Sequence, residues 1–89
     1  MDNKERARSM HNAVIAQLNA EITTADKTPT SLAREMGINY GSFRRYLNGE
    51  QPMHLFMVWD ILAALNVSPT EFMQSAEALH SRGPGSPKS

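Results

Sequence analysis

Residues 28–49 constrain the fold of this chain most strongly, because they contain two short apolar helices with defined start and stop signals. Thr28 is placed to cap the first helix with its hydroxyl, and Pro29 suits the first helical position, where no amide partner is needed. Gly37 supplies the left-handed residue that ends this helix. An Asn-Gly pair ends the second helix in the same way. The stretch therefore predicts two short helices joined by a tight turn.

The apolar residues of these two helices indicate that both pack on one core. They are Leu32, Ala33, Met36, Ile38, Phe43, Tyr46 and Leu47. Within each helix their spacing places them on one face. Asn39 is the expected N-cap of the second helix. The residues expected on the outward face of that helix are Tyr40, Gly41, Ser42, Arg44 and Arg45. A short helix that is fixed by its back face and presents two arginines has the geometry of a helix-turn-helix recognition helix.

A longer helix is predicted before this pair, over residues 4–23. Its apolar stripe consists of Ala7, Met10, Val14, Leu18 and Ile22, with Ile15 beside it. Lys4, Arg6 and Arg8 lie at its start, where positive charge opposes the helix macrodipole. Two interpretations of these basic residues remain open, namely contact with a DNA backbone and a solvated, frayed helix end.

Two further helices are predicted towards the C-terminus. The fourth runs from His54 to Leu65, with a core stripe of Leu55, Val58, Trp59, Leu62 and Leu65, and with Phe56, Met57 and Ile61 at its sides. The fifth follows the cap Ser68, and Phe72, Met73, Ala76 and Leu79 line one side of it. There is no strand signal, so we expect an all-α protein. Its single domain would cover residues 1–80, followed by a disordered Gly/Pro/Ser tail over residues 81–89.

Composition argues against several classes of function. The chain has no cysteine, and its three histidines lack metal-ligand spacing, so we expect neither a metal nor a cofactor. No Ser, His and acidic set suits nucleophilic catalysis, and no Gly-rich phosphate loop is present, so we do not expect an enzyme. No apolar run is long enough for a membrane span and no signal peptide precedes the first helix, which favours a cytoplasmic protein.

The formal net charge is zero, which argues against a nucleic-acid partner because phosphate neutralisation supplies most non-specific affinity. The distribution of charge is uneven, however. Residues 1–50 hold seven of the nine Lys and Arg residues, whereas residues 51–80 hold none. A neutral protein can still bind DNA specifically, and for this one we expect weak non-specific binding with a modest salt dependence.

Residues 32–49, followed by Leu-Ala-Ala-Leu-Asn-Val-Ser at 62–68, resemble the Cro/cI-type helix-turn-helix family (the XRE family) of phage repressors and bacterial regulators. The matching marks are a Leu-Ala pair before Gly37, an apolar residue after it, another six positions past it, and the Asn-Gly stop. The resemblance covers residues 28–73, about half of the chain. It implies a compact five-helix lambda-repressor-like domain, with the helix-turn-helix at helices 2 and 3, and a sequence-specific transcriptional regulator that binds double-stranded DNA.

The resemblance also implies which residues contact DNA, with the recognition helix, about residues 39–47, in the major groove. The expected base contacts are Tyr40, Gly41, Ser42, Arg44 and Arg45. An arginine guanidinium can pair with O6 and N7 of guanine, although a phosphate clamp and a solvated surface pair remain alternatives for both arginines. The expected backbone contacts are Lys27, Thr28, Thr30, Ser31, Arg34 and Asn39. For the hydroxyl groups the alternative is simple helix capping, and for Arg34 it is an exposed ion pair with Glu35.

One position departs from the family pattern. Many members carry Lys or Arg directly after the Asn-Gly stop, where this chain has Glu50 and Gln51. The substitution removes side-chain contacts with phosphate and so predicts weaker DNA binding.

Partners follow from the same resemblance. We expect double-stranded DNA and a second copy of the chain, as a homodimer on a palindromic operator in the manner of a phage Cro or immunity repressor. The expected dimer or partner surface consists of Phe56, Met57, Met73, Ala76 and Leu79. Two alternatives remain open. The chain could be the antitoxin of a toxin–antitoxin pair, or a protein-interaction module on this fold with weak DNA binding, with a toxin or an antirepressor as its protein partner.

Overall fold

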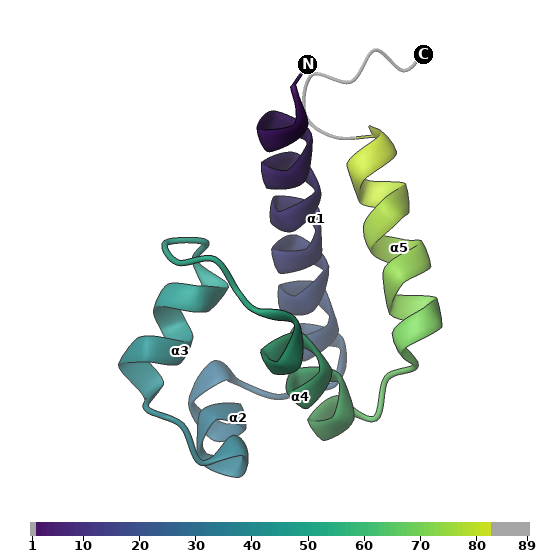
Figure 1. Cartoon of the computed structure of the whole chain (residues 1–89). Coiled ribbons are helices and arrows are strands. Elements are labelled where there is room, and N and C mark those ends of the chain that lie inside the picture. The colour runs from purple at the N-terminus through teal and green to yellow at the C-terminus, as the bar shows by residue number, and fades with distance from the viewer. Residues whose placement is uncertain (1, 83–89) are drawn as a thin grey trace.

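The computed structural model of the chain describes residues 2–82, which form five α-helices joined by short loops (Figure 1). The helices are α1 (Asn3–Thr24), α2 (Pro29–Met36), α3 (Tyr40–Leu47), α4 (Leu55–Leu65) and α5 (Pro69–Arg82). Residues 2–82 contain no strand, so the predicted all-α class is confirmed. The predicted helices are all present, in the predicted order and with closely similar bounds.

Helix α1 is the element against which most of the others are placed. It lies antiparallel to α5, and it also contacts α3 and α4 (Figure 1). Helix α2 packs on α3 and α4 and makes no extensive contact with α1. The arrangement leaves α3 at one edge of the molecule (Figure 1).

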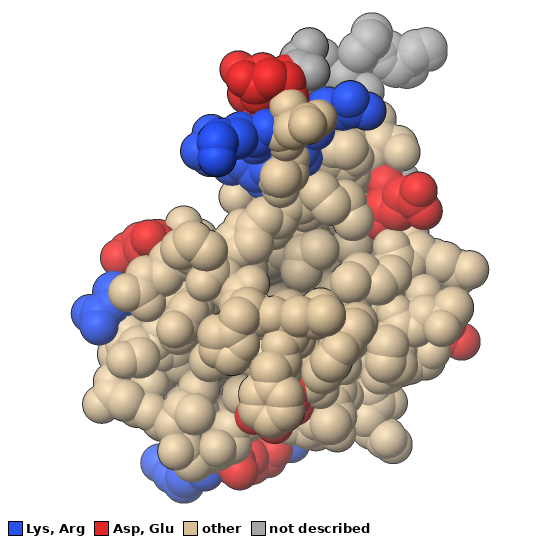
Figure 2. Space-filling view, viewed as in Figure 1, with Lys and Arg blue, Asp and Glu red and all other residues tan. Residues whose placement is uncertain are grey.

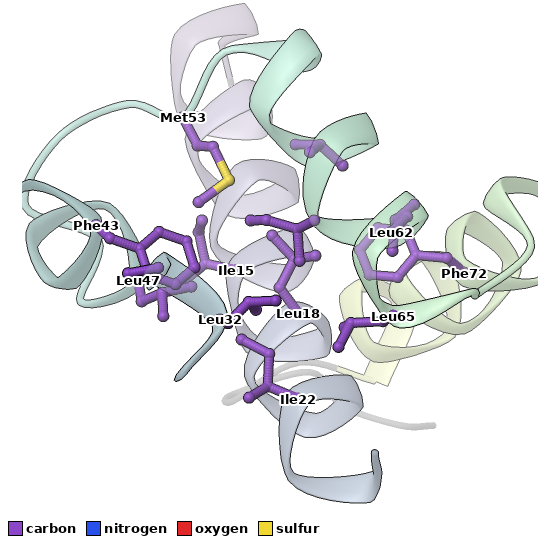
Figure 3. Close-up of a cluster of buried hydrophobic side chains, with 13 residues drawn as sticks. Ile15, Leu18, Ile22, Leu32, Phe43, Leu47, Met53, Leu62, Leu65 and Phe72 are labelled. Atoms are coloured by element: carbon purple, nitrogen blue, oxygen red, sulfur yellow. The ribbon is translucent and has the colours of Figure 1, made fainter. Parts of the chain in front are cut away.

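All five helices contribute to one hydrophobic core. The largest side chains with almost no exposed surface are Phe43, Phe72, Leu18, Leu32, Ile61 and Leu62, most of which are labelled in Figure 3. No buried side chain among the described residues is polar or charged. Because each helix supplies at least one of these residues, loss of any helix exposes part of the same core, and burial of apolar surface stabilises all five together.

The predicted apolar stripe of α1 is correct in its second half and wrong at its start. Leu18 and Ile22 are buried as predicted, and Ile15 is buried although it was placed beside the stripe. Val14 is only half-buried, and Ala7 is exposed. The first turns of α1 extend past the core and run beside α5 alone, so apolar periodicity there does not lead to burial (Figure 1).

The predicted core face of α4 is wrong at two positions. Leu55 and Trp59 were expected in the core, but 56% and 37% of their surfaces are exposed, whereas Ile61, expected at the side, is fully buried. The residues that do enter the core are Val58, Ile61, Leu62 and Leu65. Asp60 is the only residue of α4 that is not apolar. A helix that is apolar all round gives no pattern from which its inward face can be chosen.

Helix α5 begins as predicted and ends later than predicted. Phe72 and Ala76 are fully buried, and the Ser68 hydroxyl accepts a hydrogen bond from the Glu71 N–H at 3.3 Å. The helix continues to Arg82, two residues into the stretch expected to be a tail. The rest of that predicted tail, residues 83–89, lies outside the described residues.

Two side chains of α1 hold the polypeptide at the end of α3. The Asn19 side-chain amide donates hydrogen bonds to the carbonyl oxygens of Ile15 (3.0 Å) and Leu47 (3.1 Å), and so joins α1 to the last residue of α3. His11 Nε2 accepts a hydrogen bond from the Met53 N–H at 2.9 Å, which fixes the loop between α3 and α4. The bonds to the Leu47 carbonyl and from the Met53 N–H satisfy backbone groups at the end of α3 and in the loop after it, which have no helical partner.

Within residues 2–82, no helix combines the length and the apolar character that crossing a membrane requires.

Because Asn19 bridges two helices, we predict that Asn19→Ala lowers the free energy of unfolding by about 1–2 kcal/mol relative to a matched control. The control is Asn12→Ala, since Asn12 lies exposed on the same helix and makes no side-chain hydrogen bond that would be lost. Both variants gain the same helix propensity from alanine, so the difference between their urea-unfolding curves isolates the Asn19 bonds. Equal stabilities would show that the bridge contributes nothing.

Candidate nucleic-acid interface

Helix α2 begins with the capping residues that the sequence predicted. Thr28 Oγ1 accepts a hydrogen bond from the Ser31 N–H at 3.1 Å, and Ser31 Oγ accepts one from the Thr28 N–H at 3.3 Å. Pro29 takes the first helical position. Such a reciprocal capping box satisfies two amides that would otherwise lack a partner, and it defines where the eight-residue helix starts.

The turn between α2 and α3 depends on Gly37. Its φ of 71° lies in the left-handed region, and its N–H donates to the carbonyl oxygens of Ala33 and Arg34. The Ile38 N–H donates to the Ala33 carbonyl at 3.0 Å, which completes the pattern of a helix ended by a left-handed residue. Asn39 then accepts the Ser42 N–H at 3.0 Å and caps α3. The predicted roles of Gly37 and Asn39 are therefore confirmed.

Helix α3 is held by its inward face. Phe43 is fully buried, Leu47 is 5% exposed, and Tyr46 is half-buried against the core. The Asn19 amide fixes the C-terminal end of α3 through the Leu47 carbonyl. Packing on one side and capping at both ends give this short helix a single orientation on the surface of the domain.

The outward face of α3 presents most of the residues expected to contact bases. Tyr40 is 42% exposed, and Gly41, Arg44 and Arg45 are all exposed. Ser42 is half-buried and not fully outward, because it lies on the side of the helix nearer the inward-facing Phe43 and Tyr46. Four of the five residues therefore share one accessible surface.

Gly41 has a local structural role that the sequence did not reveal. A Cβ at this position would lie 3.1 Å from Asn39 Oδ1, closer than ordinary van der Waals contact. Glycine thus leaves room for the side chain that caps the helix. The same absence of a side chain leaves the backbone of the first turn of α3 open to close approach from outside.

Arg44 and Arg45 are not neutralised by an acidic side chain. Among the described side chains, those of residues 2–81, the one ion pair joins Lys27 Nζ and Glu35 Oε2, so Arg44 and Arg45 have no ionic partner. At the edge of the molecule formed by α3, basic surface lies next to an acidic side chain (Figure 2). Both arginines also lie in the last turn of α3, where positive charge stabilises the helix dipole. The position of the two arginines is therefore consistent with a structural role, the stabilisation of α3, as well as with the binding of a ligand.

The residues expected to contact a DNA backbone divide into two groups. Thr28 and Ser31 hydroxyl groups are engaged with each other and with the Thr28 carbonyl, which is the capping alternative. Lys27 is paired with Glu35 at 2.6 Å, so its charge is partly compensated. Thr30, Arg34 and Asn39 are exposed. Arg34 makes no ion pair with Glu35, whose carboxylate is paired with Lys27.

The expected partner surface is not one continuous exposed face. Phe56 is 73% exposed, but Ala76 has no exposed surface and is wrong as a surface residue, because it is packed in the core as part of α5. Met57, Met73 and Leu79 are half-buried. The exposed large side chains beside Phe56 are instead Leu55 and Trp59, which sequence reasoning had assigned to the core.

No protein-family model, curated protein or solved structure matched this chain in comparisons with all three. Within residues 2–82, no three His, Cys, Asp or Glu side chains are grouped as a metal ion would require.

Because Gly37 has a positive φ, we predict that Gly37→Ala lowers the free energy of unfolding by about 1–2 kcal/mol. A Cβ at this position would have no neighbour within 4 Å, so the cost arises from backbone strain and not from a clash. Gly37→Asn is the control, since asparagine tolerates the left-handed conformation better than alanine. Thermal unfolding should rank wild type above Gly37→Asn and Gly37→Asn above Gly37→Ala. An alanine variant as stable as wild type would contradict the assigned role.

Proposed function

We propose that this chain is a sequence-specific, double-stranded DNA-binding transcriptional regulator of the Cro/cI type, with α2 and α3 as its helix-turn-helix and α3 in the major groove. One observation carries the proposal: α3 is anchored by its inward face and holds two unpaired, exposed arginines on the other. A lambda-repressor-like arrangement of the five helices and membership of the XRE family belong to the same proposal. Their support is the order of the helices and the residues at 28–73.

The exposed face of α3 has the chemistry for base recognition. Each guanidinium can donate two parallel hydrogen bonds to O6 and N7 of guanine. Gly41 allows the first turn of α3 to approach the floor of the groove and leaves room for a thymine methyl group. Tyr40 is exposed, and in this proposal it contacts a phosphate or stacks against a sugar.

The phosphate contacts would come from exposed groups around α2. Thr30 and Arg34 are accessible, and the Asn39 side chain is exposed while its oxygen caps α3. The Lys27–Glu35 pair would have to open or stay neutral when DNA binds. With zero net charge as well, the protein would make few phosphate contacts, and specific recognition would depend on α3 more than on electrostatic attraction.

In biological terms, the proposal is a phage Cro-like or immunity repressor that binds a palindromic operator as a homodimer. It would act in the cytoplasm, where phage and bacterial DNA lie. A protein-interaction module or antitoxin with weak DNA binding is the second candidate. Two observations favour it, namely the exposed Phe56 and Trp59 on α4 and the acidic Glu50 beside the end of α3.

Selection of bound duplexes from a random pool tests the proposal. Wild type should enrich a defined motif, and Arg44→Ala/Arg45→Ala should lose it, with each lost guanine contact weakening the selected duplex by about 1–3 kcal/mol. Arg44→Lys/Arg45→Lys is the matched control, because it keeps both charges and the helix-dipole interaction but loses the two-pronged geometry.

Three results separate the possibilities. If the motif is lost in both double variants, the arginines contact bases. If lysine restores it fully, they serve as phosphate clamps and the assignment of base contacts fails. If wild type enriches no sequence at low salt, the DNA-binding proposal fails and the protein-interaction module becomes the favoured function.

A substitution at Glu50 should have the opposite effect and increase the affinity for DNA. It lies just past α3, where its carboxylate accepts a hydrogen bond from the Asn48 amide at 3.4 Å. We predict that Glu50→Lys strengthens binding of the selected duplex and makes the slope of log K against log salt more negative by about one, as one added phosphate contact would. Glu77→Lys makes the same charge change at an exposed position of α5 and should leave the slope unchanged. Equal slopes for the two variants would contradict a phosphate beside residue 50.

A further inference from the structure

Two histidine side chains accept hydrogen bonds at the loop between α3 and α4. His11 Nε2, on α1, accepts the bond from the Met53 N–H at 2.9 Å. His54 Nδ1, directly before α4, accepts one from the Met57 N–H at 3.3 Å and caps that helix. The DNA-binding proposal uses neither imidazole. Both imidazoles nevertheless act on the short segment that joins α3 to α4.

The bond from Met53 is the one on which the position of the loop depends. Residues 48–52 are all exposed, whereas Met53 is 8% exposed and its side chain points into the core (Figure 3). Met53 is therefore the residue at which the loop returns to the core. Its N–H lies outside the helices, and His11 Nε2 is the acceptor that satisfies it. Loss of this acceptor leaves a part-buried N–H without a partner, which disfavours the closed loop.

Both hydrogen bonds require a neutral imidazole. A ring nitrogen accepts only while it carries no proton, and an imidazolium is a donor at both nitrogens. Protonated His11 would turn an N–H towards the Met53 N–H. Protonated His54 would do the same towards Met57, and it would place a positive charge at the N-terminus of α4, which the helix dipole disfavours. The effect at His54 is the smaller one, because this side chain is exposed and the Met57 N–H has a second acceptor, the His54 carbonyl, at 3.1 Å.

We propose that the loop between α3 and α4 is restrained in a proton-sensitive manner, by neutral His11 and more weakly by neutral His54, and that it is released when these side chains take up protons. Histidine is the side chain that ordinarily changes its charge between about pH 5 and 8. Because only the neutral form accepts, the bonds are present at the upper end of this range and are lost as the pH falls.

No carboxylate is paired with either imidazole. Arg8 lies one turn before His11 on the same side of α1, and the Tyr46 and His54 rings meet edge to face with 6.3 Å between their centroids. Glu50 lies in the loop itself. The other charged and titratable side chains on the elements packed against α1 and α4 are Arg34 and Glu35 on α2, Arg44 and Arg45 on α3, Asp60 on α4, and Glu71, Glu77 and His80 on α5. Among the side chains of residues 2–81 neither imidazole forms an ion pair, so protonation gains no ionic partner in place of the lost bonds.

This inference goes beyond the proposed function and holds whether or not α3 binds DNA. The released segment directly follows α3, whose last residue, Leu47, remains bonded to the Asn19 amide. Release therefore frees the connection to α4 and leaves the inward face of α3 in the core. If the proposed function holds as well, the same protons give the cell's pH an influence on the surroundings of the recognition helix.

The test is hydrogen exchange of backbone amides, measured by nuclear magnetic resonance on the protein without DNA. Exchange is followed at about pH 8 and at about pH 5, the limits of the ordinary histidine range, and each rate is compared with the intrinsic rate at that pH. Protection of the Met53 N–H should fall at least about tenfold at the lower pH, as loss of one ordinary hydrogen bond would cause. The amide of Leu18, which is fully buried in the centre of α1, should stay protected and so report a local opening in a folded protein.

Four variants identify the side chains responsible. His11→Gln and His54→Asn each provide an amide oxygen, which accepts hydrogen bonds and does not titrate, and the double variant should show no pH response at Met53. His11→Ala removes the acceptor and should leave Met53 poorly protected at both pH values. His80→Gln is the matched control, since it removes a histidine of α5 that is not bonded to the loop, and it should respond as wild type does.

Two outcomes would overturn the inference. Equal protection of the Met53 N–H at both pH values in wild type would show that protons do not release the loop. A pH response that persists in His11→Ala or in the double variant would assign the release to other groups.

Discussion

Burial of Phe43 and Leu47 is the interaction on which the candidate site depends. An eight-residue helix is not stable in water by itself, so α3 exists only because its inward face joins the core. The same packing leaves Arg44 and Arg45 outward, with no ion pair to an acidic side chain among the described residues. Stability and surface chemistry thus arise from opposite sides of one short helix, and the Asn19 amide adds a polar restraint at its end.

The ends of the helices could be predicted from the sequence because their causes are local. Thr28, Gly37 and Asn39 act on atoms a few residues away, and the structure places all three as expected. The inward face of α4 could not be predicted, since an almost wholly apolar helix has no polar side to mark solvent. The hydrogen bond between the Asn19 amide and the Leu47 carbonyl joins residues 28 positions apart in the sequence, and no local pattern predicts it. The Lys27–Glu35 pair likewise depends on how the turn before α2 folds back.

The molecule has two accessible surfaces of different chemistry, which the short loop between α3 and α4 joins. The α3 surface is polar and basic, suited to the edges of bases, whereas the α4 surface is apolar and uncharged, suited to another protein surface. The Met53 N–H bonded to His11 holds this loop against α1, so the two surfaces keep a defined relation.

The most direct test of this account is a titration of backbone amide signals by nuclear magnetic resonance with a duplex obtained from the random pool. If α3 lies in the major groove, the largest changes should fall on residues 39–48, with smaller ones at residues 28–34 around the start of α2. The amides of Leu55, Phe56 and Trp59 should change little at a protein concentration where the chain is monomeric. Changes confined to α4 or to the start of α1, with α3 unaffected, would contradict the account.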